Sequence, residues 1–464
     1  MHVDLWGGAL SRSSIPDLEE KMATLELSYP PSEEIVLAED VDVGSFDTSL
    51  PGQPILVSRH SRFLQVSGLT KEVLLLLSHG PVPRSELYVR LQEVGEAPYA
   101  SEQIDKTLRQ LEERQIIHAA GDAVSPCPNE QLSGPLNSRY FILKCTLLPA
   151  PLVGRMVQFF TWLFPPRLVL VAFPVMLILQ FVLWRFLFHD FRPKLIALTG
   201  WDYALLLIGN YGGLLLHELG HASACAASRL RPGPIGFGLY LVFPALYTDV
   251  TEAWKLPRDR RLVVDAGGMY FNLIAATLTA ILYFLTHRPL FFALTGLYDM
   301  VVWFSLWPFV RMDGYWMVGD LLGIPNLMSA NRDTTLWLMS RSTGGSAPPP
   351  QVLRLVSRSL RAVYIVYYVF FAFFTVIMLS LLVYFLPMIT RSLAAQSQQI
   401  FHQAAVSGLS LSLFSASFRL LGTSVPLLGI GLYLWHFLAR ATLYLRKVAE
   451  AWQSPSQESD ESNP

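Results

Sequence analysis

Charged residues are scarce in this 464-residue chain, where Asp, Glu, Lys and Arg together make up 15% of the sequence. Soluble domains carry about 25%, so the shortage argues against an ordinary soluble protein. Hydrophobic residues make up 52%, which excludes an intrinsically disordered chain, because disorder needs low hydrophobicity and high net charge. The formal net charge of −1 gives no overall field to attract nucleic acid, so no nucleic-acid partner is expected.

Cysteine is scarce, and the start of the sequence does not have the pattern of a secretory leader. Three cysteines are too few for a disulfide framework, so the sequence does not indicate an oxidising compartment. The first twenty residues carry four acidic groups and no apolar core. We therefore expect no signal peptide.

Long apolar runs are what the sequence does contain. A membrane span needs about 20 predominantly apolar residues. Six runs fit: Leu168–Leu187, Tyr203–Ala226, Leu262–Leu285, Pro289–Val310, Ala362–Pro387 and Leu420–Ala439. A seventh, Pro234–Tyr247, is too short to cross and predicts a re-entrant segment shielded by protein. The expected fold is a mainly α-helical polytopic membrane protein with about six spans.

The distribution of Lys and Arg predicts the orientation of these spans. Basic residues are concentrated in the loops after the second and fourth spans and in the C-terminal flank. By the positive-inside rule, both termini should then be cytosolic. Arg185 near the end of the first span, and Arg192 and Lys194 in the loop after it, oppose this assignment.

The part before the first span divides into segments of different character. Residues 1–50 are acidic and are predicted to be largely irregular. Residues 51–122 are predicted to form a small α+β, winged-helix-like module, from alternating strand patterns and from helices with plausible N-caps. Its expected elements are strands Ile55–Ser58, Arg62–Val66 and Gln115–His118, and helices that begin at Thr70, Ser85 and Ser101.

The remaining boundaries follow from composition. Residues 123–166 are predicted to be a linker with an interfacial helix over Pro151–Phe164. Residues 167–440 form the membrane-embedded domain. Residues 441–464 are expected to be the cytosolic end of a helix and a disordered tail.

The strongest chemical signal is His217-Glu218-Leu219-Gly220-His221, which lies inside the second predicted span. On a helix, residues i and i+4 face the same way, so both imidazoles can bind one metal ion while Glu218 serves as a general base on a metal-activated water. Ionisable groups at mid-bilayer cost about 2.5–3.5 kcal/mol each, which favours a functional role. A polar contact between helices and a proton pathway are the competing interpretations.

A catalytic zinc site usually has a third protein ligand. The candidates in or near the membrane are Asp249, Asp265, Asp299, Asp313 and Asp320. Spacing does not choose among them, because the third ligand can come from a distant helix. Asp313 is attractive because Gly314 follows it and permits close backbone approach. For any one of these aspartates, helix capping or an interfacial ion pair is the alternative.

Three motifs in this order resemble a known family. They are the metal motif with Ala222, then Phe243–Val250 with Tyr-Thr-Asp, then Pro308–Trp316 with Asp-Gly-Tyr-Trp. Together they resemble the peptide zinc metalloproteases of bacteria, which are site-2-protease-like intramembrane metallopeptidases often found with ribosomally made, modified peptides or bacteriocins. The resemblance covers roughly residues 140–440 and implies a bacterial cytoplasmic membrane.

The resemblance also implies residue roles. His217, His221 and Asp313 would be the zinc ligands, and Glu218 would be the catalytic base. Asn272, after Ala266-Gly267-Gly268, falls where the family has an Asn thought to contact substrate. The usual Gly-Pro reads Gly-Gly here, which weakens the assignment of Asn272. Asp249 in the Tyr-Thr-Asp motif is a second, weak candidate for substrate binding.

The N-terminal module resembles the small chaperone PqqD and related precursor-peptide recognition elements. This resemblance implies binding of a leader peptide as an added β-strand; a winged helix that binds nothing is the alternative. The chain is thus predicted to be a zinc metalloendopeptidase that acts on a peptide or membrane-protein substrate and matures a modified peptide or bacteriocin. The alternatives are a non-hydrolytic membrane component of a peptide-export or modification complex, with an export partner, and a proton-relaying transporter, for which no inverted repeat is seen.

Overall fold

The structure is a computed structural model that carries no ligand, metal or partner chain. It describes residues 34–48, 55–59, 62–66, 68–93, 99–120, 141–187, 198–240, 243–342, 344 and 349–407. The predicted sixth span, Leu420–Ala439, and the predicted C-terminal tail lie outside these residues. The described residues fall into two compact units, and the first takes in those within Met1–Leu136, Pro149–Pro234 and Thr248–Tyr368.

The N-terminal module in the first unit has two small antiparallel sheets and three helices. One sheet has the order β5-β1-β6 and the other β2-β3-β4. The strands are β1 (Glu34–Leu37), β2 (Val41–Ser45), β3 (Ile55–Arg59), β4 (Arg62–Val66), β5 (Val82–Pro83) and β6 (Ile117–Ala119). The helices are α2 (Leu69–Leu77), α3 (Arg84–Glu93) and α4 (Ser101–Glu113).

Helix α4 illustrates how this module is held together. Its residues Ile104, Leu108 and Leu111 recur at helical spacing and are all buried. They join the core that the strands and α2 form with Val57, Leu74 and other apolar side chains. Burying one such side chain contributes about 1.5–3 kcal/mol, so this core stabilises the packing of the helices against the strands.

Two local expectations for the module need correction. The segment expected to be largely irregular contains β1 and β2, and β1 has partners far along the chain: Ile35 pairs with Val82 and Ala119. Such long-range pairing leaves no local periodicity. Helices α2 and α4 have Gly68 and Ala100 at their N-caps, without a side-chain cap bond, so the residues expected to cap them lie inside the helices.

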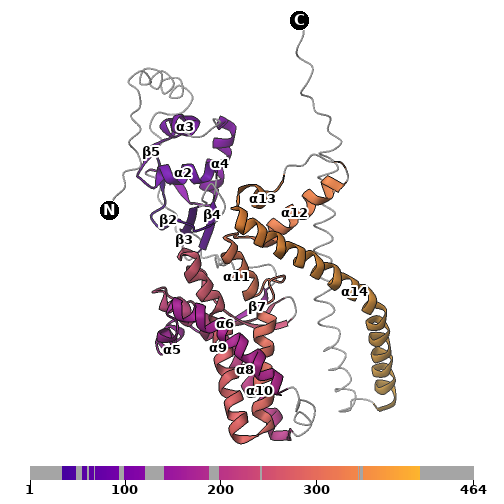
Figure 1. The fold of residues 1–464 in the computed structure, drawn as a ribbon. Helices are drawn as coiled ribbons and strands as arrows, with labels where there is room; N and C mark the ends of the chain where they lie inside the picture. Colours follow the sequence, from indigo (N-terminus) through magenta and orange to yellow (C-terminus); the bar gives the residue numbers. More distant parts are fainter. Residues whose placement is uncertain are drawn as a thin grey trace. The chain divides into compact units, whose positions relative to one another are not determined.

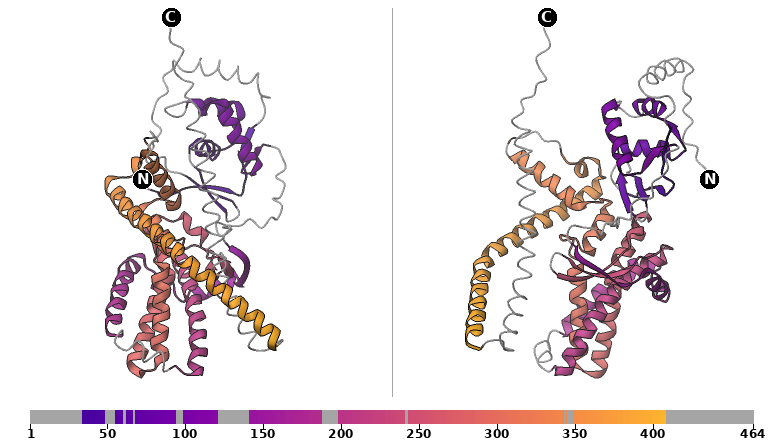
Figure 2. Two further views of the ribbon diagram at one scale, coloured as in Figure 1. Left: turned by 90° about the vertical axis from the view of Figure 1, so that its right-hand side faces the viewer. Right: turned by 180° about the vertical axis from the view of Figure 1, so that it is seen from behind.

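A helical bundle in the first unit is built on four apolar helices, α6 (Pro166–Leu187), α8 (Gly200–Ala227), α9 (Arg258–Thr286) and α10 (Pro289–Ser305). Helices α8, α9 and α10 run alongside one another (Figure 1), and Figure 2 shows the same bundle from two further sides. The chain enters α6 through the short helix α5 (Ala150–Val157) and the 3₁₀ turn η1 (Thr161–Leu163). Phe159 and Trp162 are exposed there.

Among the described residues, three helices are long and apolar enough to cross a membrane: Pro166–Phe186, Arg258–Thr286 and Arg358–Ile400. They correspond to the first, third and fifth of the predicted spans. The second predicted span forms α8, and the fourth forms α10, which has 17 residues. The chain is therefore a mostly helical protein with three candidate spans and a small β component, and six spans stay a prediction.

Glycines bring α8 against its neighbours. A Cβ on Gly220 would lie 2.2 Å from the carbonyl oxygen of Gly267 on α9. A Cβ on Gly213 would lie 2.3 Å from the ring of Tyr298 on α10. Small residues at helix interfaces allow such close approach in membranes. The pair Gly220 and Gly267 therefore fixes where α8 crosses α9.

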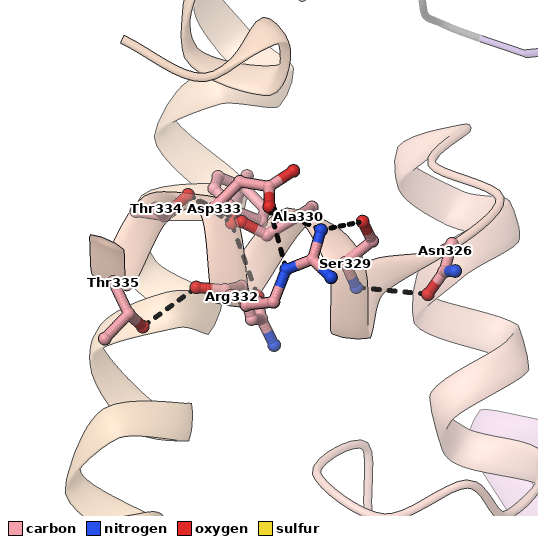
Figure 3. A network of polar contacts seen from close by, with 9 residues as sticks. Asn326, Ser329, Ala330, Arg332, Asp333, Thr334 and Thr335 are labelled. Carbon is pink, nitrogen blue, oxygen red and sulfur yellow. Dashed lines mark hydrogen bonds and ion pairs between the residues drawn. The ribbon is translucent and has the colours of Figure 1, made fainter. Parts of the chain in front are cut away.

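Helix α9 is preceded by the 3₁₀ turn η3 (Thr251–Lys255), and α10 is followed after a loop by α11 (Asp313–Leu322) and α12 (Leu327–Ser342). Figure 3 shows the start of α12, where Oδ1 of Asn326 accepts a 3.1 Å hydrogen bond from the Ser329 amide. This contact satisfies an otherwise free amide of the first turn. Arg332 pairs with Asp333 on the exposed side of the same helix at 2.8 Å.

Helix α14 (Arg358–Ser407), preceded by the short α13 (Gln351–Leu355), is fastened to α12 by buried polar contacts near its start. Nδ2 of Asn331 donates to the Tyr367 hydroxyl at 3.1 Å, and the hydroxyls of Thr334 and Tyr364 lie 2.8 Å apart. The Tyr367 hydroxyl also donates to the carbonyl of Pro308 at 3.2 Å. The loop that precedes α11 is therefore tethered to α14.

The second unit contains a three-stranded sheet of order β7-β8-β9, with β7 (Phe141–Leu148), β8 (Ile235–Tyr240) and β9 (Phe243–Thr248). Strands β7 and β8 are antiparallel, with register shifts between Ile142 and Lys144 and between Thr146 and Leu148. The segment expected to be re-entrant thus forms two strands, and its depth in a membrane stays a prediction.

Candidate metal centre

Helix α8 carries His217 and His221 one turn apart, as the spacing predicts. Both imidazoles are buried, at 7% and 8% exposure, and their Nε2 atoms lie 3.2 Å apart. Residues i and i+4 share a helix face, so the two nitrogens converge on one point. The absence of proline between Gly200 and Ala227 lets the helix run unbroken through this turn.

Asp313, the first residue of α11, completes the cluster. Its Oδ2 lies 3.0 Å from Nε2 of His217, and its Oδ1 lies 3.5 Å from Nε2 of His221. Among the described residues, these three form a group whose ligand atoms all lie within 4.8 Å of one another. Burial opposes ionisation of Asp313, yet His221 and His217, when their imidazoles are protonated, hold the pKa of its carboxyl below its ordinary value.

His221 is oriented by the backbone of α9. Its Nδ1 lies 2.8 Å from the carbonyl oxygen of Val264. A carbonyl only accepts, so Nδ1 carries the proton and the neutral ring has its lone pair on Nε2. This is the arrangement by which proteins fix the tautomer of a metal-binding histidine.

Gly268 leaves room at the point where the three side chains converge. A Cβ at this position would lie 2.4 Å from Nε2 of His221 and 2.6 Å from Nε2 of His217. Any side chain at position 268 would therefore fill the place where the two nitrogens meet. The glycine keeps a cradle open beside both imidazoles.

The donor set and its spacing fit a zinc ion. Nitrogen and oxygen ligands lie about 2.1 Å from zinc, so tetrahedral neighbours are about 3.4 Å apart. The contacts of 3.2, 3.0 and 3.5 Å among His217, His221 and Asp313 lie close to that value. Two histidines with one carboxylate are also a common protein ligand set for catalytic zinc.

Glu218 lies next to the first histidine on α8 and is half-buried. The hydroxyl of Thr248 lies 2.8 Å from its Oε2 and 3.0 Å from its backbone carbonyl oxygen, and donates to both. Thr248 is buried and ends β9. Its contact holds the Glu218 side chain in one orientation while leaving Oε1 for another partner.

Asn272 is fully buried on α9, one turn beyond Gly268. Neither its Oδ1 nor its Nδ2 has a hydrogen-bond partner among the described residues. A buried amide without partners costs about 1–3 kcal/mol. A further polar group placed beside Asn272 would therefore be stabilised by hydrogen bonds with its amide.

Asp249 belongs to a turn. Its Oδ1 accepts hydrogen bonds from the amide, at 3.1 Å, and the hydroxyl of Thr251, at the start of η3. Its backbone carbonyl accepts a 2.8 Å hydrogen bond from Gly233. These contacts organise the connection between α8 and α9 and do not place Asp249 in the metal cluster.

The other aspartates weighed as third ligands have partners elsewhere. Asp299 on α10 accepts a 2.7 Å hydrogen bond from Nε1 of Trp184 on α6. Asp320 on α11 pairs with Arg261 at 2.8 Å and shares a hydrogen bond with Asp265. Burial raises the pKa of the Asp320 carboxyl, against the effect of Arg261.

Three residues of this site are not singled out individually by the sequence: Thr248, Val264 and Gly268. Thr248 stands in the Tyr-Thr-Asp motif and Gly268 in the Ala-Gly-Gly segment, so a motif marks the neighbourhood of both. Val264 contributes only its carbonyl, and a backbone contact leaves no mark in the residue type.

Comparison with curated proteins finds a relative of the kind that this geometry suggests. The chain is 29% identical over 119 residues to a Bacillus subtilis (strain 168) protein named "Putative peptide zinc metalloprotease protein YydH". The match covers 25% of this chain and 47% of that protein, so the chain spans about half the length of the curated relative it matches. The similarity supports a zinc metalloprotease at the level of the family name. No protein-family model and no solved structure matches the chain.

Proposed function

We propose that the protein is an intramembrane zinc metallopeptidase that hydrolyses a peptide bond in a peptide or membrane-associated substrate. The observation that carries the proposal is the convergence of His217, His221 and Asp313 beside Glu218, on helices far apart in the sequence. The zinc metalloprotease name of the Bacillus subtilis relative supports the same chemistry.

The residues of the chain divide the reaction between them. A zinc ion held by the two imidazoles and the Asp313 carboxylate would polarise a peptide carbonyl and make water more acidic. Glu218 takes a proton from the attacking water as the new C–O bond forms, and passes it to the amine that leaves when the C–N bond breaks. Thr248 holds the Glu218 carboxylate in place through its 2.8 Å hydrogen bond.

A substrate backbone would find hydrogen-bond partners near this point. The Asn272 amide, which has no partner among the described residues, can donate and accept one turn along α9 from Gly268, and this supports a substrate-binding role for Asn272. Asp249 is a weaker candidate, because its carboxylate already binds Thr251.

The substrate class that we propose is a ribosomally made, modified peptide or bacteriocin. Its leader would bind the N-terminal module as an added strand, in the manner of PqqD-like elements. Strand β2 lies at an edge of its sheet, which is the feature that strand addition requires. We propose a bacterial cytoplasmic membrane with both termini cytosolic, and the three apolar helices support membrane insertion.

The test uses zinc-loaded protein in detergent micelles and a mixed library of internally quenched peptides. Glu218→Gln keeps the shape of the side chain and removes the base, so cleavage should fall at least about 100-fold with zinc content unchanged. Glu252→Gln is the matched control, since Glu252 contacts the Arg231 amide outside the site, and it should cleave at the wild-type rate. Cleavage that survives in Glu218→Gln would overturn the mechanism.

A non-hydrolytic membrane component of a peptide-export or modification complex is the second candidate. The observation that favours it is the set of direct contacts among His217, His221 and Asp313, which a structural metal site would share. It predicts zinc binding and stable capture of an export partner, with no cleavage of any library peptide by wild-type protein. A purely structural site has no need for Glu218 beside it.

A further inference from the structure

Residues Phe46–Thr48, directly after β2, contact both helices that complete the metal centre. The Asp47 carboxylate accepts a 3.0 Å hydrogen bond from the Arg258 amide at the start of α9 and pairs with Nε of Arg258 at 3.0 Å. The Thr48 hydroxyl donates at 2.6 Å to the carbonyl of Gly323, the residue that caps the C-terminus of α11. This short segment thus bridges α9 and α11.

Arg261 lies at the centre of this junction and is 4% exposed. Its three nitrogens each donate to a different part of the chain: Nε to the Asp320 carboxylate at 2.8 Å, Nη1 to the Leu256 carbonyl at 2.9 Å, and Nη2 to the Asp47 carbonyl at 2.9 Å. Its guanidinium also stacks over the ring of Phe46 at 4.7 Å. A planar guanidinium whose three nitrogens all donate hydrogen bonds fixes the groups around it in one geometry.

The spacing on both helices connects this junction to the metal centre. Arg261 and Gly268 are seven residues apart on α9, and Asp313 and Asp320 are seven apart on α11. Seven residues make about two helical turns, or roughly 10 Å, so the members of each pair lie on the same helix face. The Arg261–Asp320 contact therefore holds the two helices in register two turns away from the point where Asp313 meets the histidines.

An aromatic contact reinforces the same register. Phe46 stacks on Trp254 of η3 at 5.6 Å between ring centroids, and Trp254 meets the edge of Trp316 at 6.1 Å. Trp316 lies one turn after Asp313 on α11. The segment Phe46–Thr48 thus contacts α11 at both ends of that helix. Thr48 bonds to the C-terminal cap of α11, and Phe46 reaches its first turn through Trp254 and Trp316.

We propose that Arg261 is a positioning residue for the third metal ligand: held by Phe46 and Asp47, it fixes α11 against α9 and so sets Asp313 toward His217 and His221. The N-terminal module is thereby part of the metal centre's support. This inference rests on the metal centre of the proposed function and not on hydrolysis.

The test compares zinc affinity, by competition with a chromogenic chelator, for wild type, Arg261→Gln, Arg261→Lys and Arg258→Gln. Supporting residues around metal ligands typically contribute 10–100-fold in affinity, so Arg261→Gln should bind zinc at least about tenfold more weakly. Arg258→Gln is the matched control: Arg258 also pairs with Asp47 but is one-third exposed, so its affinity should match wild type. Arg261→Lys keeps the charge and loses the fork, and carries the test if Arg261→Gln does not fold.

A double-mutant cycle separates positioning from general stability. Arg261→Lys and Asp313→Ala are combined, and Cu²⁺ serves as the probe, because nitrogen and oxygen sites bind it more tightly than zinc and a weakened site still titrates. If Arg261 acts through Asp313, the Arg261 change should weaken binding when Asp313 is present and have no effect once Asp313 is replaced by alanine. Equal weakening in both backgrounds, or none in either, would overturn the proposal.

The same measurements separate this inference from the proposed function. Wild-type protein that binds zinc and cleaves no peptide would contradict the proposed hydrolysis. The double-mutant cycle would still decide whether Arg261 positions Asp313. Wild-type protein that binds neither zinc nor Cu²⁺ would overturn both.

Discussion

The hydroxyl of Thr248 donates a 2.8 Å hydrogen bond to Oε2 of Glu218. The two residues are 30 positions apart, and the contact joins the end of β9 to the metal-binding turn of α8. It makes the orientation of the proposed catalytic base depend on a side chain outside its own helix.

Thr248→Val should lower cleavage of library peptides about 10- to 100-fold, the range expected when a supporting hydrogen bond at a metal site is removed. The valine keeps the shape of the side chain and removes the donor, so zinc content should not change. Rates measured on zinc-loaded protein check this, with Thr248→Ser, which keeps the hydroxyl, as the control. A valine variant as active as the serine variant would show that Glu218 does not need this bond.

Gly268→Ala should abolish zinc binding. The added methyl group would stand 2.4 Å from Nε2 of His221 and 2.6 Å from Nε2 of His217, where the ion must fit. Metal analysis after gel filtration measures the loss. Gly212→Ala on α8 is the control, because a Cβ added there would meet nothing within 4 Å; normal zinc content in both variants would argue against a metal at this point.

Gly220→Ala should destabilise the helix pair α8 and α9. Its methyl group would lie 2.2 Å from the Gly267 carbonyl oxygen, and overpacking of this kind costs about 1–3 kcal/mol. Thermal unfolding in detergent should show a lower Tm than wild type. Gly212→Ala serves again as the comparison, since an alanine on an open helix surface is favoured over glycine by about 0.5–1 kcal/mol. A Tm for Gly220→Ala equal to that of Gly212→Ala would contradict the close crossing.

Asn272→Leu should separate substrate binding from folding. The amide is buried without a partner among the described residues, so a leucine of similar volume should leave the Tm unchanged or raise it. If the amide binds a substrate backbone, KM should rise while zinc content stays constant. Peptide titrations under steady-state conditions provide the measurement, and an unchanged KM would remove Asn272 from the site.

Local sequence accounts for the proximity of three residues of the candidate metal site and does not account for that of the fourth. His217, Glu218 and His221 are close in the chain, so helical periodicity alone brings them together. Asp313 is 96 residues from His217 and reaches it only through the packing of α9 and α11, which spacing does not encode. Spacing therefore leaves five aspartates equivalent, and what favours Asp313 is the glycine that follows it together with the family resemblance.

The same distinction explains the fold predictions. Helices α2, α3 and α4 have local apolar periods, and β3 and β4 form a local hairpin, so all five elements are readable from the residue pattern. Strand β1 takes its partners from tertiary structure. Contacts made by backbone atoms, such as the Val264 carbonyl with His221, are similarly invisible in residue types.

The most direct test of the account is zinc per chain in detergent-purified wild type, His221→Ala and Asp313→Ala. About one zinc in wild type, lost or weakened in both variants, is the predicted result. Zinc kept at the wild-type level in Asp313→Ala would contradict the three-ligand site that α8 and α11 form. Wild-type protein that takes up no zinc, even when zinc is supplied, would contradict the metallopeptidase itself.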